Sequence, residues 1–513
     1  MNDSSNTVVA TTGGKLEGSY QDKLYAFKGI PYATPPVGNL RWMPPQPVEP
    51  WDGVRPAKEY GPIPPQNKMV GGIITAIEQV KDEDCLYLNI WTPGLDDAKR
   101  PVMVWIHGGA FTMGSGTEAN YRNPSLAARG NIVLVTINYR LGMLGFLNLK
   151  EVTGGKIPAS GNEGLLDQIA ALRWVKENIA AFGGDPDNVT AFGESAGGMS
   201  IGCLLAMPAA RGCFKKGILE SGVGSTAGPL DEAVTTSKNA LEMAGIKGND
   251  VEALRSLSVK RLLDIEMKLR TDMAYIGEAV RITATAPVID GDVLPGIPTE
   301  VARAGSAKDI PTIIGTNLEE WKLFGAMQPG IDKLEDAGML ERLRVYLPDE
   351  GVQELIRTYR EAREKRSEPV NAFELLSAIQ TDLTFHIPAL ELVEAQRDNG
   401  QRVYNYLFNW KSPAMGGFLG ACHGLEIGFV FGGLEKLFHG TGPDAEKLSH
   451  SIQDAWLAFA RTGNPSCESI GEWPVYGNNR ATMMLGKPCH VEEMAYEDER
   501  SVWDRVQRKR VMP

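Results

Sequence analysis

One short segment, residues 189–197, limits the folds open to this chain more than any other. Four residues of strand type, Val-Thr-Ala-Phe, run directly into Gly193-Glu194-Ser195-Ala196-Gly197, and small residues continue in a helical pattern to about Met207. The pattern G-x-S-x-G between a strand and a helix is typical of a sharp turn that exposes a nucleophilic serine. Glycines are needed because the turn leaves no room for side chains. The segment predicts an α/β sheet with Ser195 as nucleophile; the plainer alternative is a serine that only caps a helix.

Neighbouring segments repeat the alternation of strand and helix. Val102–Ile106 and Ile132–Ile137 are continuous apolar runs, a helical spacing of apolar residues follows from Gly161 to about Phe182, and Lys216–Leu219 resembles a further strand. Continuous apolar runs are typical of strands that helices cover on both faces. Strands joined by crossover helices form a mostly parallel sheet. This part of the chain therefore predicts an α/β fold with a central, mostly parallel sheet.

The organisation further along the chain is less regular. Residues 230–285 are charged and helical in pattern, strand signals return at 310–315 and 402–408, and residues 353–366 form a helical stretch between them. A length of 513 residues would allow several domains at about 100–200 residues each. Because no repeats or linkers divide the chain, we expect one domain over residues 1–513 with helical insertions at about 60–80, 230–285 and 320–385.

Composition excludes several classes of function. The chain carries 52 Lys and Arg against 64 Asp and Glu, a formal net charge of −12, which argues against a general nucleic-acid or anionic-membrane binder. Its apolar stretches are too short to cross a membrane. The first residues contain neither a basic cluster nor an apolar run, so we expect a cytoplasmic protein, with a removed leader left open. Six cysteines without a cluster of histidines predict neither a metal site nor a disulfide framework.

A glycine-rich turn follows the first predicted strand. Trp105-Ile106-His107-Gly108-Gly109-Ala110-Phe111 leaves backbone N–H groups free for a substrate carbonyl to approach. Together with the N–H of Ala196, these donors are suited to hold the oxyanion of a tetrahedral intermediate, and losing one such donor typically costs about 3 kcal/mol in the barrier. By itself the turn would be an ordinary glycine loop. In combination with Ser195 it predicts an oxyanion hole.

The acid and the base of a serine hydrolase follow the serine in the chain when the fold is of the α/β-hydrolase type. After the strand at 310–315 come Glu319 and Glu320, and Asp290 and Asp292 also stay open as the acid. After the strand at 402–408 comes a glycine-rich loop that contains His423, which we predict to be the base. The other five histidines are less suited by their position: His107, His386, His439, His450 and His490. We expect His107 to shape the glycine turn.

These segments together resemble the type-B carboxylesterase/lipase family, which includes bacterial para-nitrobenzyl esterases, animal carboxylesterases and cholinesterases. The resemblance extends over essentially the whole chain. The matching segments are Phe27–Ala33, Glu83–Ile90, His107–Phe111, Asn138–Arg140, Phe182–Gly198, Gly315–Glu320 and His423–Gly432.

The resemblance implies an α/β-hydrolase fold and a serine carboxylesterase that hydrolyses small-molecule esters through an acyl-enzyme, with no metal or organic cofactor. It implies Ser195, Glu320 and His423 as the triad, since the family places the acid second in its acidic pair. It also implies oxyanion donors and a buried supporting network. The donors are Gly108, Gly109, Ala110 and Ala196, and the supporting residues are Glu194, Ser221 and Glu426.

Three positions depart from the family pattern. Trp321 stands where a glycine usually follows the acid, so the packing there is expected to differ. Cys85 has no upstream cysteine with which to form the family's first disulfide, which fits a reducing compartment. Residues 73–76 contain no aromatic side chain where cholinesterases place a tryptophan, so choline esters are poor candidates.

Two other functions stay open beside the esterase. The same triad could hydrolyse carbamates, amides or specialised xenobiotic esters. A non-catalytic adhesion module on this fold is the least favoured, because such members lose triad residues and all three are present here. Oligomeric state and substrate size do not follow from the sequence.

Overall fold

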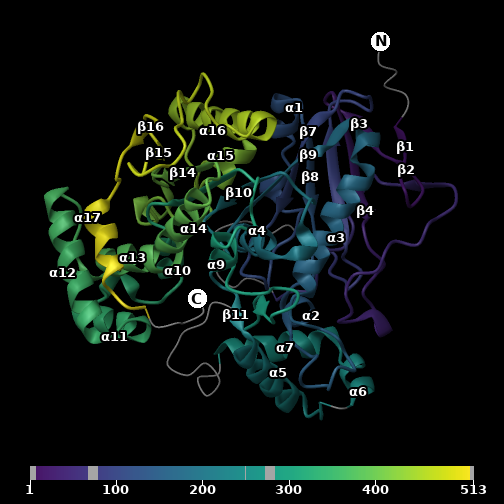
Figure 1. The fold of residues 1–513 in the computed structure, drawn as a ribbon, viewed down its shortest axis with the longest axis horizontal. Helices are drawn as coiled ribbons and strands as arrows, with labels where there is room; N and C mark the ends of the chain where they lie inside the picture. Colours follow the sequence, from purple (N-terminus) through teal and green to yellow (C-terminus); the bar gives the residue numbers. More distant parts are fainter. Residues whose placement is uncertain (1–6, 68–78, 249, 272–283, 509–513) are drawn as a thin grey trace.

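The computed structural model describes residues 7–67, 79–248, 250–271 and 284–508. Its central element is an eleven-stranded sheet in the order β16-β15-β14-β13-β10-β9-β7-β8-β6-β4-β3 (Figure 1). The strands of this sheet are β3 Ser19–Gln21, β4 Leu24–Pro31, β6 Tyr87–Thr92, β7 Arg100–Ile106, β8 Val133–Ile137, β9 Gly184–Glu194, β10 Lys216–Glu220, β13 Thr312–Asn317, β14 Val403–Phe408, β15 Thr482–Leu485 and β16 His490–Glu492. Residues 73–76, whose lack of an aromatic side chain argues against choline esters, lie outside the described part.

The middle of this sheet is parallel and its two ends are antiparallel. Strands β15, β14, β13, β10, β9, β7 and β8 pair in parallel, one beside the next. At one end β6, β4 and β3 pair antiparallel, and at the other end β16 does so. The prediction of a mostly parallel central sheet is confirmed. In a parallel sheet the carboxyl ends of the strands meet at one edge, where ligand sites form.

Helices bury both faces of the sheet. Along β7, Val102, Val104 and Ile106 belong to one hydrophobic core, together with residues of α3 (Glu163–Asn178) and α4 (Ala196–Ala206). The alternate residues Met103 and Trp105 belong to a second core, which includes Trp456 of α16 (Pro443–Thr462). Because successive side chains of a strand point to opposite faces, a strand between two cores must be apolar throughout. This confirms the interpretation of the continuous apolar runs.

The boundaries of the predicted elements agree with the structure to within a few residues. The helix expected after Gly161 is α3, continued by a 3₁₀ turn over Ile179–Phe182. The strand expected at 310–315 is β13, two residues later, and the helix expected at 353–366 is α12 (Asp349–Lys365). The prediction was incomplete at the ends of the chain. There β15 and β16 complete the large sheet, and β1 (Val8–Ala10), β2 (Lys15–Glu17) and β5 (Val54–Pro56) form a separate small sheet.

Two groups of helices extend from the sheet (Figure 1). One contains α5 (Leu230–Ala244), α6 (Val251–Arg255) and α7 (Val259–Thr271). The other contains α10 (Trp321–Ala326), α11 (Asp336–Tyr346), α12, α13 (Ala372–Thr381) and a π-helix, η6 (Asp382–His386). The remaining helices and paired strands are α1 Ser125–Gly130, α2 Gly142–Phe146, α9 Pro298–Arg303, α14 Ile387–Asp398, α15 Ile427–Phe431, α17 Glu497–Arg500, β11 Gly228–Pro229 and β12 Val288–Ile289.

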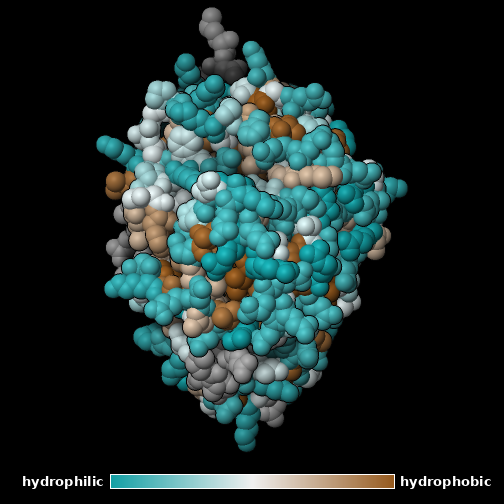
Figure 2. All heavy atoms as spheres, turned by 90° about the vertical axis from the view of Figure 1, so that its left-hand side faces the viewer, coloured by the Kyte–Doolittle hydropathy of each residue, from teal (hydrophilic) through white to brown (hydrophobic). Residues whose placement is uncertain are grey.

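The surface is largely hydrophilic on the face that Figure 2 shows, where hydrophobic residues form scattered small groups. Some large apolar side chains are exposed, Leu437 most of all at 82%. Within the described residues, we find no helix whose length and hydrophobicity would let it cross a membrane.

Candidate active site

Ser195 lies at the tip of the predicted turn, between the end of β9 and the start of α4. Its backbone has φ 55° and ψ −122°, a conformation that an L-residue adopts only under strain. The Ser195 N–H donates to the carbonyl of Glu220 on the neighbouring strand β10, at 2.8 Å. Its own carbonyl accepts the N–H of Met199 in the first turn of α4, also at 2.8 Å. The serine is thus held by the sheet on one side and by the helix on the other.

The glycines around Ser195 are required by close backbone contacts. A Cβ atom on Gly197 would lie 1.9 Å from the carbonyl oxygen of Ile106, and one on Gly193 would lie 2.5 Å from the same atom. A Cβ atom on Gly222 would lie 2.2 Å from the carbonyl oxygen of Ser195. No side chain fits at such distances, so the turn, β7 and the end of β10 pack backbone against backbone.

The glycine turn after β7 lies directly against the serine. A Cβ atom on Gly108 would lie 3.0 Å from Cβ of Ser195. Gly109, Ala110 and Phe111 all have positive φ, of 103°, 52° and 59°, which is uncommon for residues with a side chain. None of the hydrogen bonds among the described residues uses the N–H of Gly109, Ala110 or Ala196. Free N–H groups beside a serine and at the start of α4 form a site suited to negative charge.

His107 contacts this turn as expected. Its Nδ1 lies 2.8 Å from the carbonyl of Gly108, and its ring stacks on Tyr139 with the centroids 4.4 Å apart. The Tyr139 hydroxyl donates to the His107 carbonyl at 2.8 Å. Burial lowers the pKa of His107 to about 4, so its ring is neutral at neutral pH.

His423 and Glu320 form a close pair on the loops that follow β14 and β13. Nδ1 of His423 lies 2.6 Å from Oε2 of Glu320. The other carboxylate oxygen of Glu320 accepts the N–H of Asn317 at 2.7 Å, and the Glu320 side chain is fully buried. A carboxylate fixed in this way holds the imidazole in the tautomer that carries its proton on Nδ1.

The second nitrogen of His423 faces a different carboxylate from the one on Glu320. Nε2 lies 3.2 Å from Oε1 of Glu194, the residue before the serine, and no hydrogen bond between the Ser195 hydroxyl and His423 is found among the described residues. Burial alone would lower the pKa of His423, but the carboxylates of Glu194 and Glu320 raise it well above its usual range. Burial in turn raises the pKa of Glu194, while His423 opposes that shift. Hydrogen bonds of catalytic groups often align only when substrate is bound.

Glu426 and Ser221 lie in a buried polar group beneath this pair. The Ser221 hydroxyl is 3.4 Å from Oε1 of Glu426, and the side-chain amide of Asn317 donates to Oε2. Glu426 is 2% exposed, so it is a buried residue and not a solvated surface one. Burial, followed by the nearby carboxylates of Glu194 and Glu320, raises the pKa of Glu426 well above its usual range.

The alternative acids lie elsewhere. Asp290 accepts the N–H groups of Asp292 and Leu294 within a turn, and Asp292 is exposed. Glu319 approaches the loop that carries His423 and pairs with Lys322, at 2.7 Å between Oε1 and Nζ.

The alternative bases also have other partners. His386 is 3.0 Å from the hydroxyl of Thr316, and His439 accepts the N–H of Glu435. His490 is exposed on β16, and His450 lies in α16.

Aromatic rings enclose the imidazole of His423. The centroid of Phe385, in the π-helix, lies 4.8 Å from it, and that of Phe324, in α10, lies 5.1 Å from it. Trp321 packs against Phe324 with ring centroids 5.3 Å apart, and the backbone N–H of Trp321 donates to the hydroxyl of Thr381. The tryptophan therefore begins a helix that carries one wall of the site. π-Helices are rare and are often found beside functional sites.

Sequence reasoning missed three residues of the site. Asn317 links Glu320, Glu426 and the carbonyl of Cys422. Glu220 is fully buried and accepts the indole N–H of Trp456 at 2.8 Å; burial raises its pKa to about 8. Phe385 comes from a segment with no recognisable motif. A polar residue at the end of a strand was the one available signal, for Asn317.

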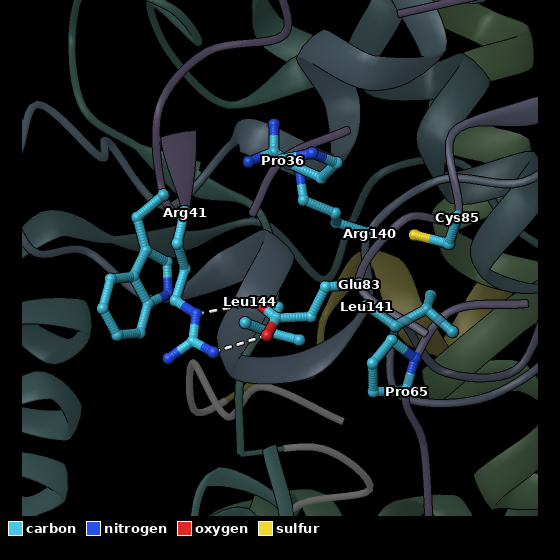
Figure 3. A pocket seen from close by; sticks show the side chains of 9 residues that line it. Pro36, Arg41, Pro65, Glu83, Cys85, Arg140, Leu141 and Leu144 are labelled. Atoms are coloured by element: carbon cyan, nitrogen blue, oxygen red, sulfur yellow. Dashed lines mark hydrogen bonds and ion pairs between the residues drawn. The ribbon is translucent and has the colours of Figure 1, made fainter. Parts of the chain in front are cut away.

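Figure 3 shows a small cavity lined by other residues. Its lining includes the ion pair between Arg41 and Glu83, together with Cys85 and Arg140. None of the lining residues is one of the predicted site residues. All six cysteines are free, and burial raises the pKa of the Cys85 thiol well above its usual range.

The chain is similar to known proteins over nearly its whole length. The model of the family described as "Carboxylesterase family" matches residues 5–503. The chain is 40% identical over 503 residues to a para-nitrobenzyl esterase of Bacillus subtilis (strain 168), covering 97% of this chain and 98% of that protein. It is 34% identical over 493 residues to a phenmedipham hydrolase of Pseudarthrobacter oxydans, covering 93% and 95%. The crystal structure of the Geobacillus stearothermophilus carboxylesterase EST55 matches with a TM-score of 0.86 at 38% identity, covering 97% of this chain and all of that one.

Proposed function

Since the chain belongs to the carboxylesterase family, we propose that Ser195, His423 and Glu320 are the nucleophile, base and acid with which it hydrolyses carboxylic esters. The observation that carries this assignment is the 2.6 Å contact between Nδ1 of His423 and Oε2 of Glu320. It is supported by the strained backbone of Ser195, which lies between the glycine turn and the start of α4.

The proposed reaction has two halves. The hydroxyl oxygen of Ser195 attacks the ester carbonyl carbon while Nε2 of His423 takes its proton, and the carbonyl electrons move to the oxygen. The tetrahedral intermediate then expels the alcohol, which takes the proton back from His423, and an acyl-enzyme remains. Water attacks the acyl-enzyme with His423 again as base, and the acid product leaves. Glu320 stays ionised throughout and stabilises the imidazolium.

The proposed oxyanion hole consists of backbone N–H groups from two elements. Gly109 and Ala110, with Gly108 beside them, supply donors from the glycine turn, and Ala196 supplies one from the first turn of α4. The positive φ angles of Gly109 and Ala110 support this role. So does the lack of partners for the N–H groups of Gly109, Ala110 and Ala196 among the described hydrogen bonds. Donors that are fixed before the reaction need no reorganisation when negative charge develops, which is why such sites accelerate acyl transfer.

Glu194, Ser221 and Glu426 are proposed to support the base. Oε1 of Glu194 lies 3.2 Å from Nε2 of His423, and a negative charge on this carboxylate attracts and so favours the imidazolium. That is the form His423 takes once Ser195 has lost its proton. Ser221 and Glu426 lie behind this pair, and Asn317 ties Glu426 to the loop of the acid.

Labelling and hydrolysis together test the assignment. An organophosphonate should bind covalently to Ser195 and abolish hydrolysis of p-nitrophenyl acetate. The Ser195→Ala variant should resist labelling and lose activity, while its unfolding temperature stays near that of the parent. Undiminished hydrolysis by Ser195→Ala would refute the proposal.

Carbamate hydrolysis is a second candidate on the same triad. The 34% identity to a protein named phenmedipham hydrolase favours it. Turnover of matched ester, carbamate and amide substrates would separate the three activities, since Ser195 attacks a carbonyl carbon in each and only the atoms bonded to that carbon differ.

The organisation of the whole chain supports two further proposals. The site draws on β7, β9, β10, β13 and β14, which are adjacent in one sheet, so we propose one catalytic domain over residues 1–513 with helical insertions. Six free cysteines support a cytoplasmic location.

A further inference from the structure

We propose that Glu319 is a positioning residue for the base, and that it holds the loop carrying His423 in place through Ala421, with Lys322 as its counter-ion. This proposal rests on the assignment of His423 as the base. It gives a role to the carboxylate that stands next to the proposed acid and that sequence reasoning could not separate from it.

The first support is a pair of hydrogen bonds between Glu319 and one residue of the loop. The N–H of Glu319 donates to the carbonyl of Ala421 at 3.0 Å, and the N–H of Ala421 donates to Oε2 of Glu319 at 2.9 Å. Both polar backbone groups of Ala421 are therefore bound by Glu319. Because Ala421 precedes His423 by two residues, a shift at Ala421 moves the imidazole as well.

The second support is the fit of the carboxylate against Gly420. This glycine has φ 54°, and a Cβ atom on it would lie 2.2 Å from Oε2 and 2.5 Å from Cδ of Glu319. The carboxylate therefore fills the space where any other side chain would begin. Gly420 is also bound from the opposite side, where its carbonyl accepts the N–H of Ser412 at 2.9 Å.

The third support is that the charge of Glu319 is balanced away from the triad. Nζ of Lys322 lies 2.7 Å from Oε1 of Glu319 and 3.0 Å from Oε1 of Glu374 in α13. Glu374 is in turn 3.4 Å from Arg363 in α12. Burial would raise the pKa of Glu319, but Lys322, the N–H of Ala421 and the charge of Lys411 together hold the pKa below its usual range. The carboxylate is therefore ionised at neutral pH, with Oε1 bound to Lys322 and Oε2 bound to the loop.

Close to the base, the loop is also held by the side-chain amide of Asn317, which donates to the carbonyl of Cys422 at 2.8 Å. The N–H of His423 itself reaches the carbonyl of Glu320 only at 3.4 Å, which is long for a hydrogen bond. The contacts of Glu319 differ from these because they connect the loop to α10 and through Lys322 to α12 and α13. The helical group after β13 thus has a function beyond lining the site, since it anchors the segment on which the base stands.

Substitutions at Glu319 and Lys322 test the proposal in the full-length enzyme. We expect Glu319→Ala to lower kcat for p-nitrophenyl acetate by about 10²-fold with KM little changed, because misplacing a catalytic group by about 1 Å has an effect of that size. The rate of organophosphonate labelling of Ser195 should fall in parallel. Glu319→Gln keeps an oxygen for Ala421 and should lose less. Lys322→Met should lower kcat about as much as Glu319→Gln does, and Lys322→Arg, which keeps the positive charge, should retain the activity of the parent.

The matched control is the ion pair between Arg41 and Glu83 in the cavity of Figure 3, whose lining contains no triad residue. Its side chains are 9% and 12% exposed, close to the 8% and 14% of Lys322 and Glu319. Glu83→Gln should lower the unfolding temperature as much as Glu319→Gln does, without changing kcat. This separates a loss of position at the base from a general loss of stability.

The outcomes are distinct. A fall in kcat and in labelling rate that exceeds the control, with KM unchanged, supports the positioning role. Unchanged kcat in Glu319→Ala, or a fall matched by Glu83→Gln, overturns it. If Glu319→Ala does not fold, the isosteric Glu319→Gln and the pair Lys322→Met and Lys322→Arg decide by the same criteria. Activity that survives Ser195→Ala would instead overturn the proposed function.

Discussion

The turn at Ser195 and the region of His423 and Glu320 are built in opposite ways. The turn is made of consecutive residues, and its shape follows from backbone contacts that only glycine permits, such as the 1.9 Å distance that a Cβ atom on Gly197 would have to the Ile106 carbonyl. The acid and base come from loops about a hundred residues apart. They are fixed by side-chain hydrogen bonds, including the one of 2.6 Å between Nδ1 of His423 and Oε2 of Glu320.

This difference explains why the sequence pointed to one candidate nucleophile but left several candidates for the acid. A glycine requirement is local, so it leaves a readable pattern. A choice between neighbouring carboxylates depends on which one faces a loop that is distant in sequence, and adjacent residues such as Glu319 and Glu320 look alike until that loop is placed. Substitutions that add volume should therefore disrupt the turn, and substitutions that remove a charge should disrupt the acid and base.

The largest expected effect is at the acid. We expect Glu320→Gln to lower kcat by about 10⁴-fold, because the amide cannot hold the imidazole in the required tautomer, as for the corresponding change in a known serine protease. Steady-state hydrolysis of p-nitrophenyl acetate measures it. Asp292→Asn, at an exposed alternative carboxylate, is the control and should keep full activity. Equal activities of the two variants would contradict the assignment.

A methyl group in the turn should have the next largest effect. Gly197→Ala places a Cβ atom 1.9 Å from the carbonyl oxygen of Ile106, so the turn must open and move Ser195. We expect a loss of kcat on the order of 10²-fold and a loss of stability of about 1–3 kcal/mol. Gly217→Ala in the adjacent strand β10 is the control, since its nearest contact is 3.4 Å. Similar kinetics for both variants would show that the contacts around Gly197 do not fix the serine.

Much of the fold could be predicted because it rests on the same local signals. Continuous apolar runs identified β7 and β8, since both faces of those strands are buried. The outer strands escaped prediction because they are short and include polar residues, as in Thr482–Leu485 and His490–Glu492. Such strands are specified by pairing with a neighbour that is distant in sequence, so their own sequence pattern does not predict them.

The site could be predicted as a set of residues but not as a geometry. The order of serine, acid and histidine left Glu319, Asp290 and Asp292 open beside Glu320, and the family resemblance rather than the residues made the choice. Nothing in the sequence indicated that Nε2 of His423 would face Glu194, or that Asn317 would join two carboxyl groups. Both contacts arise when β9, β13 and the histidine loop are brought together by the sheet.

Glu426 offers an effect on stability that is smaller than the catalytic losses. In Glu426→Ala the side-chain amide of Asn317 loses one of its two acceptors in a buried site, so we expect the free energy of unfolding to fall by about 1–3 kcal/mol. Burial raises the pKa of Glu426, so the native side chain is largely neutral and Glu426→Gln should be tolerated better. Urea denaturation of both variants measures the difference, and equal losses would contradict a neutral, hydrogen-bonded Glu426.

The same raised pKa fixes the sign of the pH dependence. Below the ordinary glutamate pKa of about 4.3 both the folded and the unfolded chain carry the proton. As pH rises, the unfolded chain releases it first, so the stability that the protonated Glu426 contributes is lost progressively through the native pKa. The parent protein should therefore lose stability relative to Glu426→Gln as pH increases, and the opposite trend would show that the native carboxyl group is ionised.

Substitution of Glu194 is expected to change the maximal rate least. It is also the sharpest test of the acid and base region. His423 acts as a base only when neutral, so kcat/KM must fall as pH drops through its pKa, which Glu194 and Glu320 raise. Removing one carboxylate in Glu194→Gln should move this acid limb to lower pH by about 1–3 units with little effect on the plateau. Glu220→Gln is the matched control, because the buried Glu220 bonds to Trp456 and is not one of the carboxylates that raise the pKa of His423. An acid limb that stays in place in Glu194→Gln would mean that the contact with Nε2 does not persist in solution, and the base would then depend on Glu320 alone.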